Sequence, residues 1–183
     1  DVLDHTSTPM GARRLHNWIL FPLLDLEEIR RRHNSVEYFL RDPSTRQRAD
    51  EILKGVGELE RLVMKVGARR IGPRDTRQLH DSLQACGALR RALAGSDSPE
   101  LRAIAGSMAD CSDLVDTIGR TVRPDAPIQL GKSPALAEGV DPELDELRAL
   151  RAHGRDALRS IQERESAATG IPSLKIGFNN VFG

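Results

Sequence analysis

The fold is decided by residues 79–122, which read LHDSLQACGALRRALAGSDSPELRAIAGSMADCSDLVDTIGRTV. Two apolar stripes run through this segment at alternating spacings of three and four residues, the period at which side chains share one face of an α-helix. The first stripe comprises Leu79, Leu83, Cys86, Leu89 and Leu93, and the second comprises Leu101, Ile104, Met108, Cys111, Val115, Ile118 and Val122. Residues 95–99 between them read GSDSP, a turn followed by helix caps. The segment predicts two antiparallel neighbouring helices, the second running to about residue 122.

Further helices are predicted on the N-terminal side of this pair. Thr8 and Pro9 begin a helix that extends to about Leu20, because a hydroxyl cap and a first-turn proline favour a helix start. Asp25 caps the next helix, which ends at residues 42–44 and carries the stripe Leu26, Ile29, His33, Val36 and Leu40. A further apolar stripe predicts one more helix, which ends at residues 71–73. This stripe comprises Ile52, Val56, Leu59, Val63 and Val66.

The C-terminal region predicts a long helix followed by a β element. Asp141, Pro142 and Glu143 form a strong helix start, and the helix continues to about Thr169. Its apolar residues lie in the first part, so the far end is expected to project; they are Leu144, Leu147, Leu150, Leu158 and Ile161. Gly170 is placed to stop the helix. Beyond it, a half-buried strand and a turn are predicted from the alternation of Leu174, Ile176 and Phe178 with Lys175, Gly177 and Asn179.

Together these patterns predict an all-α fold, a multi-helix bundle with a long projecting helix that carries a short β element at its distal end. The expected divisions are a helical bundle over 1–140, the long helix over 141–169, and a first strand and turn over 170–183. Aromatic residues are only 3% of the chain, and the apolar positions are mostly Leu, Ile, Val and Ala, which favours helices. Residues 124–139 hold three prolines and two glycines and are expected to form a long connection or a short extended pass.

Charge and hydropathy exclude several classes of function. Lys plus Arg and Asp plus Glu both number 27, so no global field attracts nucleic acid or a membrane. The longest uncharged apolar run, residues 18–24, is far shorter than the roughly 20 residues that span a bilayer. The chain starts without Met or a secretory signal, so we expect it to begin inside a longer gene product. Cys86 and Cys111 are expected to be free thiols in a reducing compartment, which favours a cytoplasmic location.

No catalytic, cofactor-binding or metal-binding residue is predicted. The five histidines are scattered without a metal-ligand spacing, and His33 on its apolar stripe is expected to be a hydrogen-bonded core or boundary residue. The chain contains no glycine-rich phosphate loop and no nucleophile elbow. Asp110, Asp113 and Asp116 recur three residues apart beside an apolar stripe, which favours a solvated helix flank over acid–base chemistry.

Two groups of residues are candidates for nucleic-acid contact. The clusters at residues 30–32 and 61–77 lie beside acids and lack interleaved aromatics, so a solvated helix face is favoured for them. Lys175, Asn179 and Asn180 lie at the projecting tip, where a charge and short amide donors could contact DNA phosphates without reading bases. The alternative for these three residues is an ordinary strand edge and turn.

Four segments resemble the MutS family of DNA mismatch-recognition ATPases, in order and over essentially the whole chain. They are residues 4–15 (DHTSTPMGARRL, continuing to Trp18 and Pro22), 57–62 (GELERL), 143–148 (ELDELR) and 163–183, with ERE, TGI and LKIGFN. The resemblance implies a fragment, namely a helical core or lever domain that continues into the first strand of a DNA clamp. A mild departure at residues 131–136, where Pro134 removes a ladder donor, affects only the local fold.

The resemblance also implies where the remaining activities lie. The family's mismatch-reading motif and nucleotide-binding loop fall outside this chain, so the fragment is not expected to be an enzyme. ATP and Mg²⁺ are implied only for the parent. Implied partners are double-stranded DNA through the clamp, other domains of the same chain and a second copy of the parent. The resemblance assigns the DNA-facing role of the clamp to Lys175, Asn179 and Asn180.

Two hypotheses for function follow. The first is a mechanical lever that links a DNA-backbone clamp to an ATPase elsewhere in the parent. The second is a stand-alone helical scaffold or adaptor that binds another protein through the apolar stripe between Leu144 and Ile161.

Overall fold

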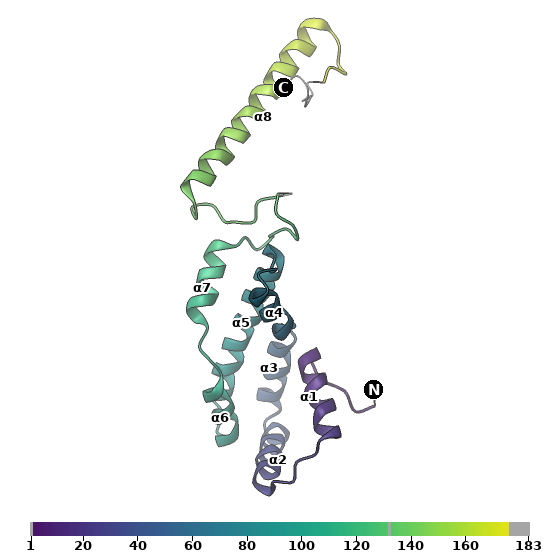
Figure 1. The fold of residues 1–183 in the computed structure, drawn as a ribbon, viewed down its shortest axis with the longest axis vertical. Coiled ribbons are helices and arrows are strands. Elements are labelled where there is room, and N and C mark those ends of the chain that lie inside the picture. Colours follow the sequence, from purple (N-terminus) through teal and green to yellow (C-terminus); the bar gives the residue numbers. More distant parts are fainter. Residues whose placement is uncertain (1, 132, 176–183) are drawn as a thin grey trace. The chain divides into compact units, whose positions relative to one another are not determined.

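The computed structural model describes residues 2–131 and 133–175, and within them it is all-helical. The contacts divide the chain into residues 1–137 and 138–183, which we describe separately. The helices are labelled in Figure 1 and comprise α1 (Pro9–Leu20), α2 (Leu26–Arg41), α3 (Pro43–Leu53), α4 (Leu59–Gly67), α5 (Pro73–Ala94), α6 (Pro99–Ser107), α7 (Ser112–Thr121) and α8 (Pro142–Thr169).

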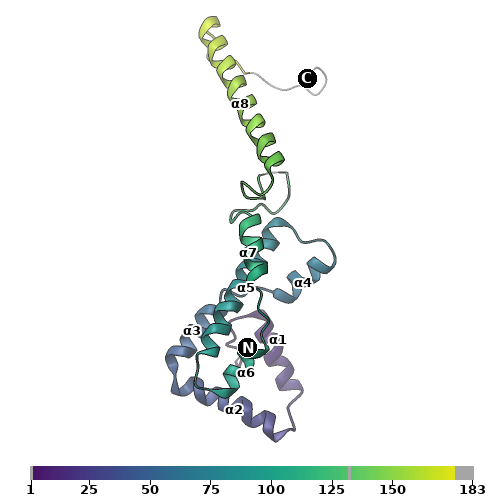
Figure 2. The same cartoon turned by 90° about the vertical axis from the view of Figure 1, so that its left-hand side faces the viewer.

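Helix α5 is the centre of the first unit. It packs against α3, α4, α6 and α7 (Figure 1), and Figure 2 shows α4 standing out to one side of it. The two ends of α5 contribute to two different apolar clusters. Leu79 belongs to the first cluster and Leu93 belongs to the second. The first cluster comprises Leu62, Leu79, Ile118, Val122 and Ala126, and the second comprises Leu93, Leu101 and Ala105. The antiparallel pairing predicted across residues 95–99 is confirmed, because the end of α5 clusters with the start of α6 and the start of α5 clusters with the end of α7.

The second stripe forms two helices rather than the one predicted. Helix α6 ends at Ser107 and α7 begins at Ser112. Asp110 Oδ1 accepts a hydrogen bond from the Ser112 N–H at 3.0 Å, which starts a new helix. A short acidic side chain that bonds the backbone two residues on competes with helix continuation. The apolar stripe faces the core on both sides of the break, because Leu101 and Ile118 are both buried.

The stripe from Ile52 to Val66 is likewise interrupted. The Gly57 N–H donates to the Ser82 Oγ of α5 at 3.0 Å instead of continuing a helix ladder. A Cβ atom on Gly57 would lie 2.9 Å from Gln78 Nε2, so α5 passes close to this backbone. The core residue of α4 is Leu62, which is 1% exposed, whereas Val63 is exposed.

The predicted buried face of α2 is wrong. Leu26, Val36 and Leu40 are all exposed, and His33 is exposed as well rather than a core or boundary residue. Helix α2 instead packs through Tyr38 and Phe39 against the cluster around Leu93. The aromatic side chains bury more area than the leucines, which turns the helix to that side.

The buried histidine is His80 of α5, which is 5% exposed. Its Nδ1 lies 2.7 Å from Asp81 Oδ1, so the ring is hydrogen-bonded. Its position on the long stripe-bearing helix, one residue after Leu79, could have indicated burial.

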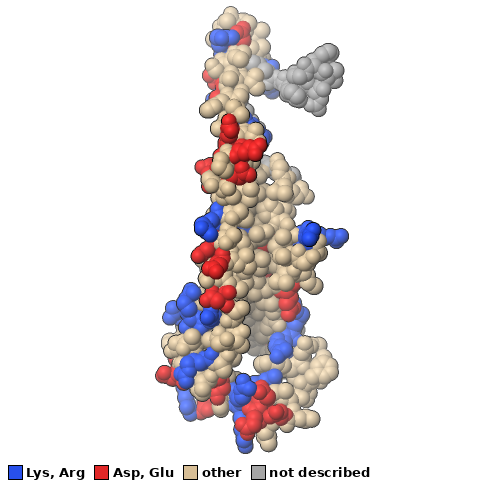
Figure 3. Space-filling model, turned by 60° about the vertical axis from the view of Figure 1, so that its left-hand side comes forward, with Lys and Arg blue, Asp and Glu red and all other residues tan. Residues whose placement is uncertain are grey.

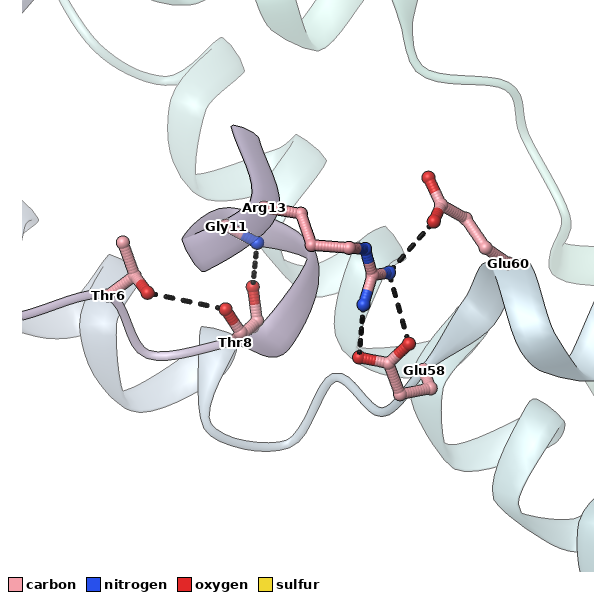
Figure 4. A network of polar contacts seen from close by, with 6 residues as sticks. All are labelled: Thr6, Thr8, Gly11, Arg13, Glu58 and Glu60. Atoms are coloured by element: carbon pink, nitrogen blue, oxygen red, sulfur yellow. Dashed lines mark hydrogen bonds and ion pairs between the residues drawn. The ribbon is translucent and has the colours of Figure 1, made fainter. Parts of the chain in front are cut away.

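Helix α1 has the predicted bounds and is held mainly by polar contacts. Thr8 Oγ1 accepts from the Gly11 N–H at 3.0 Å and caps the helix. The Arg13 guanidinium reaches both Glu58 and Glu60, at 3.0 and 2.8 Å (Figure 4). No residue of α1 is buried, so these ion pairs position it beside the start of α4.

The predicted connection after α7 is irregular in its described residues. One antiparallel bridge joins Val122 and Leu136, made by Arg123 N–H to Ala135 O at 3.0 Å and Ala137 N–H to Thr121 O at 2.9 Å.

The second unit contains the predicted long helix, α8. Asp141 Oδ1 accepts from the Glu143 and Leu144 amides, and Gly170 ends the helix in the left-handed conformation with φ 69°. The predicted strand does not begin at residues 174–175, and its remainder, with the turn at Asn179 and Asn180, lies outside the described residues. The described fold is therefore all-helical, and the distal β element stays a prediction.

Candidate nucleic-acid interface

The chain folds back against α8 after Gly170. Ser166 Oγ donates to the Ile171 carbonyl at 2.7 Å, and Gln162 Nε2 donates to the Leu174 carbonyl at 2.8 Å. These bonds join residues five and twelve positions apart, so residues 171–174 lie along the last two turns of the helix. The tip of α8 is thereby formed by its last two turns together with the returning residues 171–174.

Lys175 is the described candidate contact at this tip. Its side chain is exposed, and it makes no ion pair within the described part of the chain. The neighbouring arginines are neutralised, because Arg159 pairs with Glu163 at 3.0 Å and Arg164 pairs with Glu165 at 3.1 Å. Lys175 therefore offers an ammonium group for an anion. Asn179 and Asn180 lie outside the described residues, so their grouping with Lys175 stays a prediction.

The basic cluster on α2 has partners for all three arginines, and the second cluster is paired in part. On α2, Arg30 bonds Glu27 at 2.8 Å, Arg31 bonds Glu28 at 2.5 Å, and the Arg32 guanidinium lies 3.8 Å from the centre of the Trp18 ring. Lys65 and Arg77, in the second cluster, bond acids of α5 at 2.6 and 3.2 Å. Figure 3 shows acidic and basic side chains interspersed over the face it displays. These contacts favour the solvated-face interpretation.

Part of the second cluster keeps its charge unpaired. Arg61, Arg69, Arg70 and Arg74 form no ion pair within residues 2–131 and 133–175. Arg69 has φ 54°, the left-handed conformation, and the amides of Arg69 and Arg70 bond back to Val66 O and Lys65 O at 2.9 and 2.8 Å. This pattern is a Schellman motif, so the conformation of Arg69 serves to end α4.

Of the aspartates that flank the second stripe, Asp110 has structural contacts. Asp110 accepts from the Ser112 amide and pairs with Arg90 at 2.8 Å, and these contacts lower the pKa of its carboxyl to about 2. Asp113 and Asp116 are exposed, as expected for a solvated flank. Among the described residues, no group of three His, Cys, Asp or Glu side chains could hold a metal ion. Every helix within residues 2–131 and 133–175 is too short or too polar to span a bilayer.

Comparisons with known proteins match this chain along its length. A family model described as MutS domain III matches residues 1–169. The chain is 48% identical over 183 residues to the DNA mismatch repair protein MutS of Porphyromonas gingivalis, over all of this chain and 20% of that protein. It is 43% and 40% identical to the proteins of the same name from Parabacteroides distasonis and Flavobacterium psychrophilum, over all of this chain and 21% of each relative. The chain thus spans about a fifth of the length of these relatives.

Proposed function

Because this chain belongs to the MutS family of DNA mismatch repair proteins and corresponds to its domain III, we propose that it acts as a mechanical lever. In this proposal, α8 carries displacement between a DNA-contacting tip and the helical unit formed by residues 1–137. The observation that carries the proposal is the match to domain III through residue 169, which includes the whole of α8.

The physical properties of α8 suit a lever. Its 28 residues give a rod about 40 Å long at about 1.5 Å per residue. Both ends are defined, by the Asp141 cap and by Gly170. The ion pair between Arg159 and Glu163 joins successive turns on its exposed surface, and such pairs support a helix in water. A rod of this kind transmits motion without chemistry of its own.

We propose that Lys175, with Asn179 and Asn180, holds the DNA backbone. An exposed lysine and short amide side chains suit phosphate contacts, which position a duplex without reading its sequence. Mismatch recognition then belongs to other parts of the parent.

Fluorescence anisotropy of labelled duplex DNA, matched and singly mismatched, tests this contact at two salt concentrations. We expect weak binding without mismatch preference that falls with salt, and that is weakened further in Lys175→Ala. Lys54→Ala is the matched control, because Lys54 is an exposed lysine already paired with Asp50 at 2.8 Å. Absence of binding, or equal effects of the two variants, would remove Lys175 as a contact. A clear preference for mismatched DNA would contradict the assignment of recognition to other domains.

The lever itself is tested in the full-length protein that contains this chain. Gly139 has φ 80° and precedes α8, so Gly139→Val strains the start of the lever. We expect altered nucleotide-dependent release of DNA in this variant, because the two states of the lever would change in relative stability. Unchanged release would count against the lever.

We assign the remaining activities to the parent protein. ATP hydrolysis with Mg²⁺ is proposed for a domain outside this chain, since these 183 residues contain no phosphate loop. The exposed residues Leu147, Leu150 and Leu158 of α8 favour contact with other parts of that parent. A dimeric parent and a cytoplasmic location belong to the same proposal. A stand-alone adaptor is not favoured, because the whole chain aligns within longer relatives.

A further inference from the structure

We propose that Cys86 and Cys111 form an oxidisable thiol pair, which a low-molecular-weight disulfide converts into an internal disulfide. The pair belongs to the first unit, whereas Lys175 belongs to the second, and the proposal does not depend on DNA contact. It would join the middle of α5 to the junction between α6 and α7.

Both cysteines line one cavity. The cavity has a volume of about 480 Å³ and lies between the second half of α5 and residues 109–116. Both thiols are half-buried and free. Burial, and then the nearby Cys111 thiol, raise the pKa of Cys86, so the two side chains are close enough to interact electrostatically. Their shared cavity gives a small reagent access to both.

The backbone around Cys111 favours closure of the pair. Residues 108–111 are outside any helix, and Cys111 immediately precedes the first residue of α7. Asp110, the residue before Cys111, bonds Arg90 of α5 at 2.8 Å, so the junction is tied to the helix that carries Cys86, one turn beyond it. A disulfide requires Cα atoms roughly 4.4–6.8 Å apart, and this tie between the junction and α5 favours that approach.

The surroundings assign different roles to the two thiols. Cys111 lies in the non-helical segment before α7, where its thiol lines the cavity through which a reagent enters. The Arg90 guanidinium lines the same cavity, although it is paired with Asp110. Cys86 is less easily ionised because it is buried in α5. Cys111 is therefore the attacking thiol and Cys86 the resolving thiol.

The reaction balances as two thiol–disulfide exchanges. Cys111 loses its proton and attacks one sulfur of the small disulfide, whose S–S bond breaks to leave a mixed disulfide and one thiolate that takes up the proton. Cys86 then loses its proton, attacks Cys111 Sγ and expels the second thiolate, which is protonated in turn. Two protein thiols are oxidised, and the small disulfide is reduced to two small thiols.

The test is incubation of the 183-residue chain with glutathione disulfide, followed by intact mass and non-reducing peptide mapping. We expect the mass to fall by two hydrogen atoms and a peptide to appear that links Cys86 to Cys111. Cys86→Ala should trap glutathione on Cys111, whereas Cys111→Ala should react more slowly, with circular dichroism confirming that both variants keep their helices.

Several outcomes would overturn the proposal. One is glutathione retained on the unmodified sequence without the internal link. A second is a link that joins two chains instead of one. A third is a thiol pair that reacts only after addition of urea, because the folded cavity would then not admit the reagent.

Discussion

Ser82 is the polar side chain on which the junction between α3 and α4 depends. It is 1% exposed, and its Oγ accepts from the Gly57 N–H at 3.0 Å and donates to the Gln78 carbonyl at 2.8 Å. The first of these bonds joins residues 25 positions apart. One hydroxyl therefore satisfies a backbone amide that has left the helix ladder.

Replacing this hydroxyl should be costly. Ser82→Ala leaves the Gly57 amide without its partner in a largely dry site, so we expect the free energy of unfolding to fall by about 1–3 kcal/mol. Urea denaturation followed by circular dichroism measures the change. Ser107→Ala is the control, because the exposed Ser107 hydroxyl bonds only the Ile104 carbonyl of its own helix and should cost less than about 0.5 kcal/mol. Equal losses in the two variants would show that the Ser82 contact is unimportant.

Because of Asp110, the free energy of unfolding is expected to depend on pH in the acid range. The pKa of Asp110 is about 2 in the folded chain, below the ordinary value of 3.8, because the Ser112 amide and Arg90 favour the carboxylate. A lowered folded pKa stabilises the native state above the ordinary value, and this stabilisation is lost as the pH falls toward the folded value. The window is therefore roughly pH 4 to 2.

Asp110→Asn should accordingly destabilise the chain at pH 7, and the difference from the unmodified sequence should disappear by about pH 2. Urea midpoints measured across this range would reveal the convergence. Asp113→Asn serves as control, since the exposed Asp113 carboxylate makes no hydrogen bond within the described residues. A difference for Asp110→Asn that stays constant with pH would contradict the assignment.

At the scale of elements, the end of α4 stores strain in one residue. Arg69 has φ 54° in the Schellman motif, a conformation that side chains with a Cβ atom adopt at a cost. Glycine adopts it freely.

Arg69→Gly should therefore stabilise the chain by about 0.5–1 kcal/mol, measured as a shift of the urea midpoint. The same change one residue later, Arg70→Gly, removes an equal charge at a position without positive φ and should be neutral or destabilising. If both variants shifted stability equally, the effect would come from charge rather than from backbone strain.

At the scale of the whole molecule, the two units differ in how their helices are supported. Helix α5 buries Leu79, His80, Ser82 and Leu93. Helix α8 is longer, yet it buries none of its described side chains. Stability that comes from packing should therefore be concentrated in α5, since an isolated helix in water is only marginally stable.

Hydrogen exchange followed by mass spectrometry should show this difference. We expect amides in the middle of α5 to exchange more slowly by at least tenfold than those in the middle of α8, because α8 opens without disrupting a core. Helix α4, which buries Leu62 alone, should be intermediate. Equal protection of α5 and α8 would indicate that α8 is packed in solution.

The sequence by itself determined the all-helical class, the family resemblance and the starts of α1, α2 and α8. The side chains of Thr8, Asp25 and Asp141 each accept a hydrogen bond from an amide two or three residues ahead. Such local contacts can be predicted from a short stretch of sequence. It also indicated the packing of Leu79 and Leu93, because helical periodicity places them on one face.

Only the tertiary structure decided which faces are covered and where the stripes break. Periodicity states which side chains share a face, but not whether a neighbour lies against it, so α2 was turned by Tyr38 and Phe39. The break at Gly57 depends on Ser82, far along the chain, and the shared cavity of Cys86 and Cys111 likewise joins residues from different helices. Lys175 is exposed, but its contact with DNA remains a prediction, and so does its grouping with Asn179 and Asn180, which lie outside the described residues.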